Sequence, residues 1–505
     1  MSEEIKQTEQ TEEAASAKRV NKFDGFFGIT KSGSNFRTEI VAGVTTFMAM
    51  VYILMVNAGM FSEVIGGEYP YGAAYIATAI GAIVGTLLMA LFAKMPLAQA
   101  SGMGVNAFIV YTLVLGGTGL SYANCMVFTL LDGVIFLVLT ATGLRKKIFE
   151  AIPAGVRHAI PVGIGLFIAF IGMQNAGLIV NDNATLVTFT SFNILNLAAW
   201  GNGGSLNLFG DILPAAIALL GVIAIAIMSK KNIKGAILWG ILGSAVVYYA
   251  IQGIGAACGS ETSRALFASI TMSSPFDAFG AWGKDAVGKV FYEGFDFRPY
   301  FGFNANNNAW TLIVLLLTTA LSLCMIDMFD TIGTLYGACA KGNLLDEKGV
   351  PLNMNKMMLA DAIATCAGAV AGTSTVTTFV ESASGVAAGG KTGFTALVTA
   401  GCFFVAMFLS PIAQLIPTCA TATALIWVGV LMMTSVTKID WSDAGEAIVA
   451  FLTFIVMVLG YSISKGIGIG IIAYILVKLC TGKVKEISAS TWVIGVIFLA
   501  TFILT

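Results

Sequence analysis

Residues 372–382 read Gly372-Thr373-Ser374-Thr375-Val376-Thr377-Thr378-Phe379-Val380-Glu381-Ser382, a polar and β-branched stretch inside an apolar region. Alternating Thr and Val favour extended backbone, and this many hydroxyls do not suit a continuous helix that faces lipid. A second interruption, Pro96-Leu97-Ala98-Gln99-Ala100-Ser101-Gly102-Met103-Gly104-Val105-Asn106, lies in the first half of the chain. Each stretch interrupts the third apolar segment of its half, and this correspondence decides the fold.

The composition makes lipid the main solvent of this chain. Of 505 residues, 57% are hydrophobic and only 11% are charged, whereas a soluble protein carries about 25% charged residues. The apolar residues form separate runs of about 20 residues, the length that crosses a bilayer as a helix. We therefore expect an all-α polytopic membrane protein located in the cell membrane.

Charge and cysteine usage exclude other classes of protein. The net charge of -1 and the absence of a basic stripe give no reason to expect a nucleic-acid partner. The eight cysteines lie mostly in apolar runs without CxxC spacing, so we interpret them as small core residues. The sequence thus predicts no cofactor and no metal site.

Fourteen apolar spans can be placed, in two sets of seven. They lie near 38–57, 73–93, 97–116, 121–142, 158–179, 211–229, 235–256, 310–340, 356–372, 374–390, 393–414, 417–435, 444–463 and 466–481. The apolar tail 491–504 looks too short to span, and we expect it to be interfacial or packed on the bundle. An odd-numbered unit used twice must be inverted in its second copy, so the sequence predicts a 7+7 inverted repeat.

Lys and Arg residues set the expected orientation, because short cytoplasmic loops are enriched in them. With the N-terminus inside, the predicted cytoplasmic loops hold most of the basic residues: Arg145, Lys146, Lys147, Arg157, Lys230, Lys231, Lys234, Lys341, Lys348, Lys356, Lys391, Lys438, Lys483 and Lys485. Both termini are then cytoplasmic, and the long loop 257–308 is outside. The polar start, 1–17, lacks the apolar core of a signal peptide, so we expect a disordered cytoplasmic tail.

The two interrupted spans are the expected binding site. We expect a short extended segment in each, followed by half-helices that begin near Asn106 and Glu381 and face one another at mid-membrane. Backbone N–H groups at such breaks are free for a ligand. Asn106 and Glu381 could instead serve only to cap or satisfy the broken backbone.

Acids inside apolar spans need a reason, because a charge at the centre of a spanning helix costs about 3 kcal/mol. Asp327 and Asp330 are three residues apart, and Thr331 and Thr334 continue the same helical face. One polar stripe therefore runs along an otherwise apolar helix. Either aspartate could merely bond to a broken neighbour, but the pair favours a functional site.

Four motifs in order resemble those of the purine permeases, the hypoxanthine/guanine/adenine branch of the nucleobase/cation symporters in the xanthine/uracil permease superfamily. They are the stretches 35–47 (NFRTEIVAGVTTF), 102–108 (GMGVNAF), 327–335 (DMFDTIGTL) and 373–382 (TSTVTTFVES). The resemblance covers nearly the whole chain. A single motif of this kind would not be specific, but four together are.

The resemblance implies a core domain and a gate domain that move as an elevator. It divides the chain into a tail (1–34), a first core segment (35–142), a first gate segment (143–256), the extracellular loop (257–308), a second core segment (309–414) and a second gate segment (415–505). By matching motif, it implies that Asn106, Asp327 and Glu381 bind the base, with Met103 and Val380 beside them. It assigns Asp330 to proton coupling, together with Asp327 and Glu381. The family also implies proton symport and frequent homodimers.

The chemistry agrees with a purine cargo, expected to be guanine, hypoxanthine or adenine. Ring N–H and exocyclic donors of a purine can be accepted by a carboxylate, and buried carboxylates can take up and release protons. Three alternatives remain. Sodium could replace the proton, because the aspartates and threonines are hard oxygen ligands. An anion transporter of the same layout would be opposed by several acids, and an intramembrane aspartyl protease would need facing aspartates rather than two on one turn.

Overall fold

The computed structural model describes residues 22–65, 69–143, 152–192, 207–270, 273–304, 307–347 and 349–504. Three expectations fall outside the described residues. They are the disordered tail 1–17, the basic loop residues Arg145 to Lys147, and Lys348.

Helices dominate the first half of the chain, because only a helix satisfies every backbone group of an apolar segment internally. They are α2 (Lys22–Phe27), α3 (Phe36–Met50), α4 (Tyr52–Ile65), α5 (Tyr71–Leu88), η2 (Met89–Ala93), α6 (Met103–Ala107), η3 (Phe108–Val114), α7 (Tyr122–Thr142), α9 (Ala154–Asn175), η5 (Leu208–Ile212), α10 (Leu213–Lys230) and α11 (Ala236–Ala257).

The second half is equally helical. Its elements are α12 (Glu261–Ser269), α13 (Pro275–Asp285), α14 (Lys289–Tyr292), α15 (Arg298–Phe303), α16 (Ala309–Lys341), α17 (Met354–Ala371), α18 (Ser382–Ala387), α19 (Gly393–Ala406), η6 (Met407–Leu409), α20 (Ser410–Gln414), α21 (Thr418–Met432), η7 (Met433–Lys438), α22 (Ala444–Leu459), α23 (Ile463–Cys480), η8 (Val484–Glu486) and α24 (Ala489–Leu504).

Within the described residues, ten helical stretches are long and apolar enough to cross a membrane. The chain is therefore a multi-pass membrane protein. The other four expected spans, 97–116, 356–372, 374–390 and 444–463, contain helices that are shorter or more polar: Met103–Val114, α17, α18 and α22. Two of these four are the interrupted segments. The exact number of fourteen spans stays a prediction.

The extended segments expected in the third and tenth spans are present, and they pair with each other. Strand β1 (Gln99–Ser101) is antiparallel to β4 (Val376–Thr378), with Ala100 opposite Thr377. The half-helices that follow begin at Met103 and Ser382, so the first begins earlier than the expected position near Asn106. A β-hairpin, β2 (Ile179–Asp182) with β3 (Leu186–Phe189), follows α9, and the expected all-α fold did not include it.

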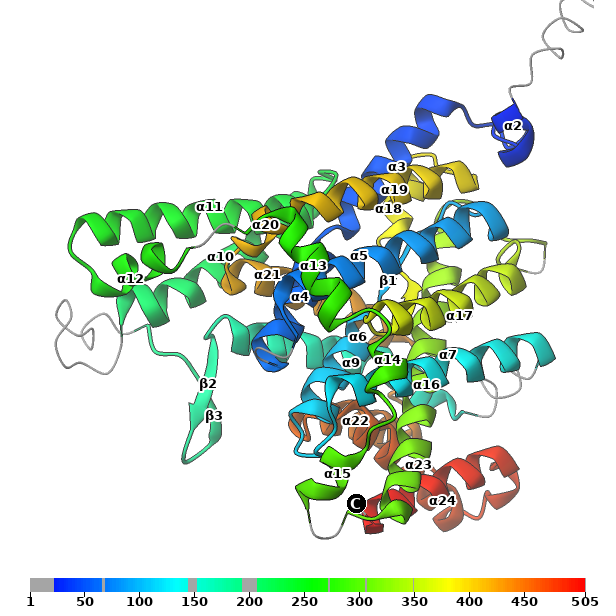
Figure 1. The fold of residues 1–505 in the computed structure, drawn as a ribbon. Helices are drawn as coiled ribbons and strands as arrows, with labels where there is room; N and C mark the ends of the chain where they lie inside the picture. The colour runs from blue at the N-terminus through cyan, green and yellow to red at the C-terminus, as the bar shows by residue number, and fades with distance from the viewer. Residues whose placement is uncertain are drawn as a thin grey trace, which may run out of the picture.

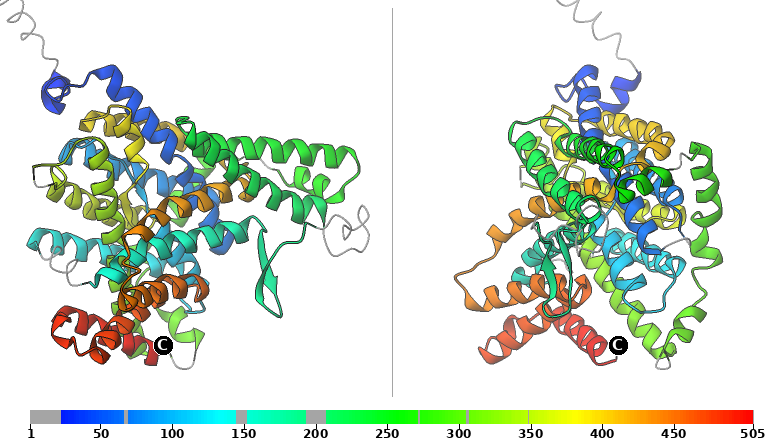
Figure 2. Two further views of the ribbon diagram at one scale, coloured as in Figure 1. Left: turned by 180° about the vertical axis from the view of Figure 1, so that it is seen from behind. Right: turned by 90° about the vertical axis from the view of Figure 1, so that its left-hand side faces the viewer.

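The long helices pack in two groups (Figures 1 and 2). In the first group, α3 packs against α18 and α19, α5 against α4, α17 and α19, and α7 against α16 and α17. In the second group, α9 packs against α21, α22 and α23, and α10 against α11 and α21. In Figure 1, α10, α11 and α12 extend to the left of the bundle, while α23 and α24 lie together at its lower end.

The segment 257–308 is structured where it is described. Its helix α12 packs on α11 and η5 of the second group, whereas α13 packs on α5, and α14 on α7 and α17, all of the first group. The indole Nε1 of Trp282 also donates to the carbonyl of Ala371, at 2.9 Å. The segment therefore attaches to both groups, and the change from one to the other occurs between α12 and α13.

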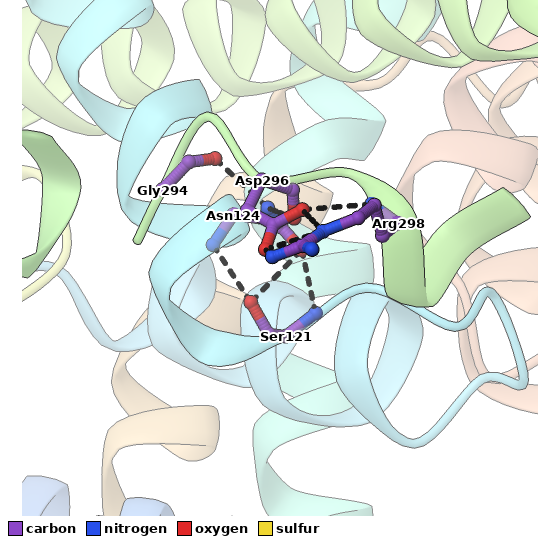
Figure 3. Close-up of polar contacts among 5 residues, drawn as sticks. All are labelled: Ser121, Asn124, Gly294, Asp296 and Arg298. Atoms are coloured by element: carbon purple, nitrogen blue, oxygen red, sulfur yellow. Dashed lines mark hydrogen bonds and ion pairs between the residues drawn. The ribbon is translucent and has the colours of Figure 1, made fainter. Parts of the chain in front are cut away.

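Asn124 anchors this segment to α7 (Figure 3). Its Nδ2 donates to the carbonyls of Gly294 (2.8 Å) and Asp296 (3.0 Å), while its Oδ1 accepts from Ser121 at the start of the helix. The guanidinium of Arg298 hydrogen-bonds the Asp296 carboxylate and lowers the pKa of Asp296 to about 2. This exposed ion pair thus remains charged throughout the physiological pH range.

The apolar tail, expected to be interfacial or packed on the bundle, forms α24. This helix packs on α23 of the second group and on α16 of the first. Phe498 is buried there, and its ring fills the space over Gly468 of α23. The tail is therefore part of the bundle.

Candidate functional site

A cavity of about 270 Å³ lies where the two helix groups meet. Its size is close to the lower limit of small-molecule sites, about 300 Å³. The first group contributes Tyr52, Met103, Gly104, Ile326, Phe329, Asp330, Gly333, Thr334, Gly337 and 378–381, and the second contributes Pro161, Ile164, Ile168, Val428, Leu431, Met432, Thr434, Ser435 and Lys438. Most of the wall is apolar, so the few polar groups fix what can bind.

Glu381 lies between strand β4 and helix α18, at the break in the tenth span. Its side chain lines the cavity and is 9% exposed. The hydroxyl of Tyr52 donates to Glu381 Oε1 at 2.6 Å, and Tyr52 itself is fully buried. One carboxylate oxygen is therefore held by the first span, and the group keeps further acceptor capacity for a ligand.

Asp330 lines the same cavity from α16. The hydroxyl of Thr377 on β4 approaches its Oδ2 at 3.4 Å. The cavity-lining residues of α16 are spaced three, four, seven and more residues apart, as on one face of a helix: Ile326, Phe329, Asp330, Gly333, Thr334 and Gly337. The glycines on this face leave room beside the carboxylate.

Met103 and Val380, the other two expected contact residues, also line the cavity. Met103 is the first residue of α6, directly after the β1 strand. A Cβ on the next residue, Gly104, would lie 2.8 Å from the side chain of Ile164 on α9, so a larger residue there would require a shift of one of the two helices or of Ile164. Gly104 thus allows α6 to approach the second helix group across the cavity.

Asn106, which was expected to bind the base, lies on α6. It is 1% exposed and is not among the residues that line the cavity. Its Oδ1 accepts from Ser101 Oγ at 2.9 Å and also from Ser374 Oγ, so it joins the two interrupted spans. Its Nδ2 has no hydrogen-bond partner among the described residues.

Asp327 is fully buried in α16 and does not line the cavity. It lies next to the lining residue Ile326, on the neighbouring face of the helix. The expected polar stripe therefore divides. Asp330 and Thr334 line the cavity, whereas Thr331 points away and donates to Asp361 Oδ2 of α17 at 2.8 Å.

Three buried polar residues of the first helix group were not among the expected site residues. Tyr52 carried a signal, because a tyrosine inside an apolar span needs a partner for its hydroxyl. Asp361 is fully buried and also accepts from Gln99 Nε2 of β1 at 3.0 Å. Glu39 is fully buried at the start of α3 and accepts from Thr392 and Thr395. Both acids lie in apolar spans, and this position is the sequence feature that could have identified them.

The site can bind a small, mostly apolar molecule that presents hydrogen-bond donors. Two carboxylates and one lysine are the charged groups of the cavity wall. Lys438 is exposed at one end, so the enclosed part of the wall is acidic. Among the described residues, no group of three or more His, Cys, Asp or Glu could hold a metal ion.

Comparisons with known proteins agree with one another. The model of the Permease family matches residues 37–469. The chain is 36% identical over 475 residues to the guanine/hypoxanthine permease PbuO of Bacillus subtilis, covering 94% of this chain and 98% of that protein. It is 33% identical over 479 residues to the adenine permease AdeQ of Escherichia coli, covering 95% of each.

Solved structures with the same fold have little sequence in common with this chain. The transmembrane domain of the cyanobacterial bicarbonate transporter BicA superposes with a TM-score of 0.56 at 16% identity, over 86% of this chain and 97% of that one. The inward-facing murine Solute Carrier 26 family member A9 gives a TM-score of 0.57 at 12% identity, over 92% and 72%. These likenesses concern the fold alone.

Proposed function

The chain belongs to the Permease family, and from this premise we propose that it imports purine nucleobases by proton symport across the cytoplasmic membrane. The resemblance to the purine permeases is confirmed, and the protein is a transporter rather than an enzyme. The proposed cargo is guanine, hypoxanthine or adenine, because the relatives are named as permeases for these bases.

One observation carries the proposal: the Glu381 carboxylate, held by Tyr52 at 2.6 Å, lines an otherwise mostly apolar cavity. A planar base can bury its faces against side chains such as Met103, Phe329 and Phe379. Its ring N–H can donate to Glu381, and a hydrogen bond to a charged group contributes about 1.5–3 kcal/mol. The cavity therefore suits a neutral donor-bearing ring.

In the proposed arrangement, the first helix group is the core domain and the second is the gate domain. The base binds at Glu381, Met103 and Val380. Asp327 and Asn106 complete the set proposed from the motifs, although neither lines the cavity in this conformation. Asp327 and Asn106 are then expected to reach the base only in another state of the cycle.

Asp330 is proposed to carry the coupled proton, together with Asp327 and Glu381. It shares the cavity with Glu381, and two carboxylates close together do not both remain charged without cost. Uptake of a proton before or with the base removes part of this repulsion. External protons thereby favour loading, and their gradient drives net import.

Anion transport is the rival suggested by fold alone, since BicA is a bicarbonate transporter. Asp330 and Glu381 in the enclosed part of the cavity would repel an anion. Uptake by proteoliposomes of labelled hypoxanthine, competed by unlabelled guanine, adenine and bicarbonate, tests the cargo. Competition by guanine and adenine but not by bicarbonate supports the proposal. Competition by bicarbonate but not by the purines overturns it.

A further inference from the structure

Two exposed residues mark one end of the cavity, which we call its open end. Thr434 and Lys438 line the open end and are exposed. Helices α9 and α16 both continue past the opposite end of the cavity, beyond Ile168 and Ile326. There the two helix groups touch through five residues that we call the latch: Tyr111, Thr112, Ser322, Tyr461 and Ser464.

Tyr461, in the turn between α22 and α23, is the centre of the latch. The hydroxyl of Thr112 on η3 donates to the Tyr461 carbonyl at 3.2 Å, and the ring of Tyr111 packs edge-on against the Tyr461 ring at 5.7 Å. On the other side, the Tyr461 hydroxyl donates to Gln174 Oε1 of α9 at 2.7 Å. Because η3 packs against α4 and α7, it belongs to the first helix group, and Tyr461 links that group to the second.

The backbone of Tyr461 has a φ of 49°, a left-handed conformation that a bulky residue adopts at a cost. Such a conformation persists where surrounding contacts hold it. The rings of Phe167 and Phe170 supply two of these contacts, with centroids 5.2 Å and 6.0 Å from that of Tyr461. The strained residue is therefore kept in place by its own helix group and presents its carbonyl to the other.

A second polar contact crosses between the groups nearby. The hydroxyl of Ser322 on α16 donates to that of Ser464 on α23 at 2.8 Å, and Ser322 is fully buried. Ser322 lies one helical turn beyond the cavity residue Ile326. Helix α22 runs between the open end of the cavity and the latch, because it starts after Lys438 and ends before Tyr461. Its 16 residues measure about 24 Å.

We infer that the latch closes the path to the site on the side opposite Lys438, which is the outer side in the predicted orientation, and that it must separate whenever the site opens to that side. This inference rests on the proposed transport function. Each contact joins a residue of the first helix group to one of the second. Relative motion of the groups therefore breaks these contacts together, while the contacts of Tyr461 with Gln174 and Phe167 stay intact within one group.

A disulfide across the latch tests the inference. In Ser322→Cys/Ser464→Cys, the two sulfur atoms replace oxygens 2.8 Å apart, a spacing from which a disulfide can form. We expect oxidation of the full-length variant in proteoliposomes to reduce hypoxanthine uptake at least about tenfold, and a reductant to restore it. Each single variant controls for native cysteines such as Cys324. Unchanged uptake by protein that mass spectrometry shows to be cross-linked would overturn the inference.

A second variant needs no disulfide and no substrate. Thr112→Val removes the donor to Tyr461, and Val380→Cys places a reporter in the cavity. We expect Thr112→Val to raise labelling of the reporter by an impermeant maleimide from the side opposite Lys438 at least about threefold. Thr421→Val, which loses a hydroxyl bond to the Thr418 carbonyl within α21, is the matched control. Equal labelling in the Thr112 variant and the control contradicts the latch.

The two experiments separate failure of the latch from failure of the transport proposal. If the parent protein takes up no purine base, the proposed function fails, but the labelling experiment still reports on the latch. If the parent transports and neither experiment responds, the proposed function stands and the latch is wrong.

Discussion

Tyr52 and Glu381, 329 residues apart in sequence, meet at 2.6 Å through one hydrogen bond at the wall of the cavity. The tyrosine comes from α4, directly after the break at Val51 that separates α3 from α4. The glutamate comes from the break between β4 and α18. A carboxylate that would otherwise rotate in the cavity is thereby held in one orientation.

We predict that Tyr52→Phe weakens hypoxanthine binding about tenfold, because Glu381 loses the donor that orients it. Tyr75→Phe is the matched control: its buried hydroxyl donates to the Ala406 carbonyl, away from the cavity. Equilibrium binding of labelled hypoxanthine to the purified proteins measures the difference. Equal losses in the two variants would mean that Tyr52 acts only on stability.

A second prediction separates binding from coupling. Glu381→Gln replaces an acceptor oxygen with a donor that faces the N–H of the base, so binding falls by about one to two orders of magnitude. Asp327→Asn weakens binding similarly. Asp330→Asn retains measurable binding but abolishes concentrative uptake, because asparagine does not exchange a proton.

Binding and uptake of labelled hypoxanthine, measured side by side for the three variants, distinguish these roles. Undiminished binding by Glu381→Gln would place the site elsewhere. Concentrative uptake by Asp330→Asn would remove that residue from the coupling.

Native cysteines test the membrane orientation. Cys258 and Cys480 are both exposed, and they lie at the start of the 257–308 segment and near the basic residues Lys483 and Lys485. With that segment outside and both termini inside, an impermeant maleimide added to intact cells labels Cys258 but not Cys480. Cys258→Ser and Cys480→Ser identify the labelled site. Labelling of Cys480 in sealed cells would invert or break the fourteen-span topology.

The two interrupted spans were predictable from local patterns. A run of Thr and Val favours a strand at Val376–Thr378, whereas the break at Gln99–Ser101 was indicated by its small and polar residues in the corresponding span of the first half. The rule that a buried acid in an apolar segment needs a specific role selected Glu381 and Asp330, which line the cavity, and also Asp327, which does not. The strand pairing and the placement of Asn106 depend on how the two halves meet. The spacing of residues along α16 does not decide whether the Asp327 side chain faces the cavity.

The hydrogen-bond partners of Tyr52 and Glu39 could not be predicted from local sequence patterns either. Each bond joins residues more than 300 positions apart, and only the tertiary packing brings them together. Glu39 lies at the start of α3, where it accepts hydrogen bonds from Thr392 and Thr395 and from the backbone N–H of Lys391.

We predict that Glu39→Gln lowers the free energy of unfolding by about 1–3 kcal/mol, because the charged acceptor of several bonds is lost in a buried site. Glu347→Gln, at an exposed position, should change it by less than about 0.5 kcal/mol. Thermal unfolding in detergent measures both. A Glu39 variant as stable as the parent would show that this cluster does not hold α3 to α19.

Proton-driven uptake of a purine base can be measured with purified protein in proteoliposomes. With labelled hypoxanthine outside, we expect accumulation that rises as the external pH falls from neutral, collapses with a protonophore and does not respond to a sodium gradient. The Asp296 carboxylate, with its pKa of about 2, does not titrate in this range and is no source of the response. Accumulation that persists without a proton gradient and follows sodium instead would contradict proton symport.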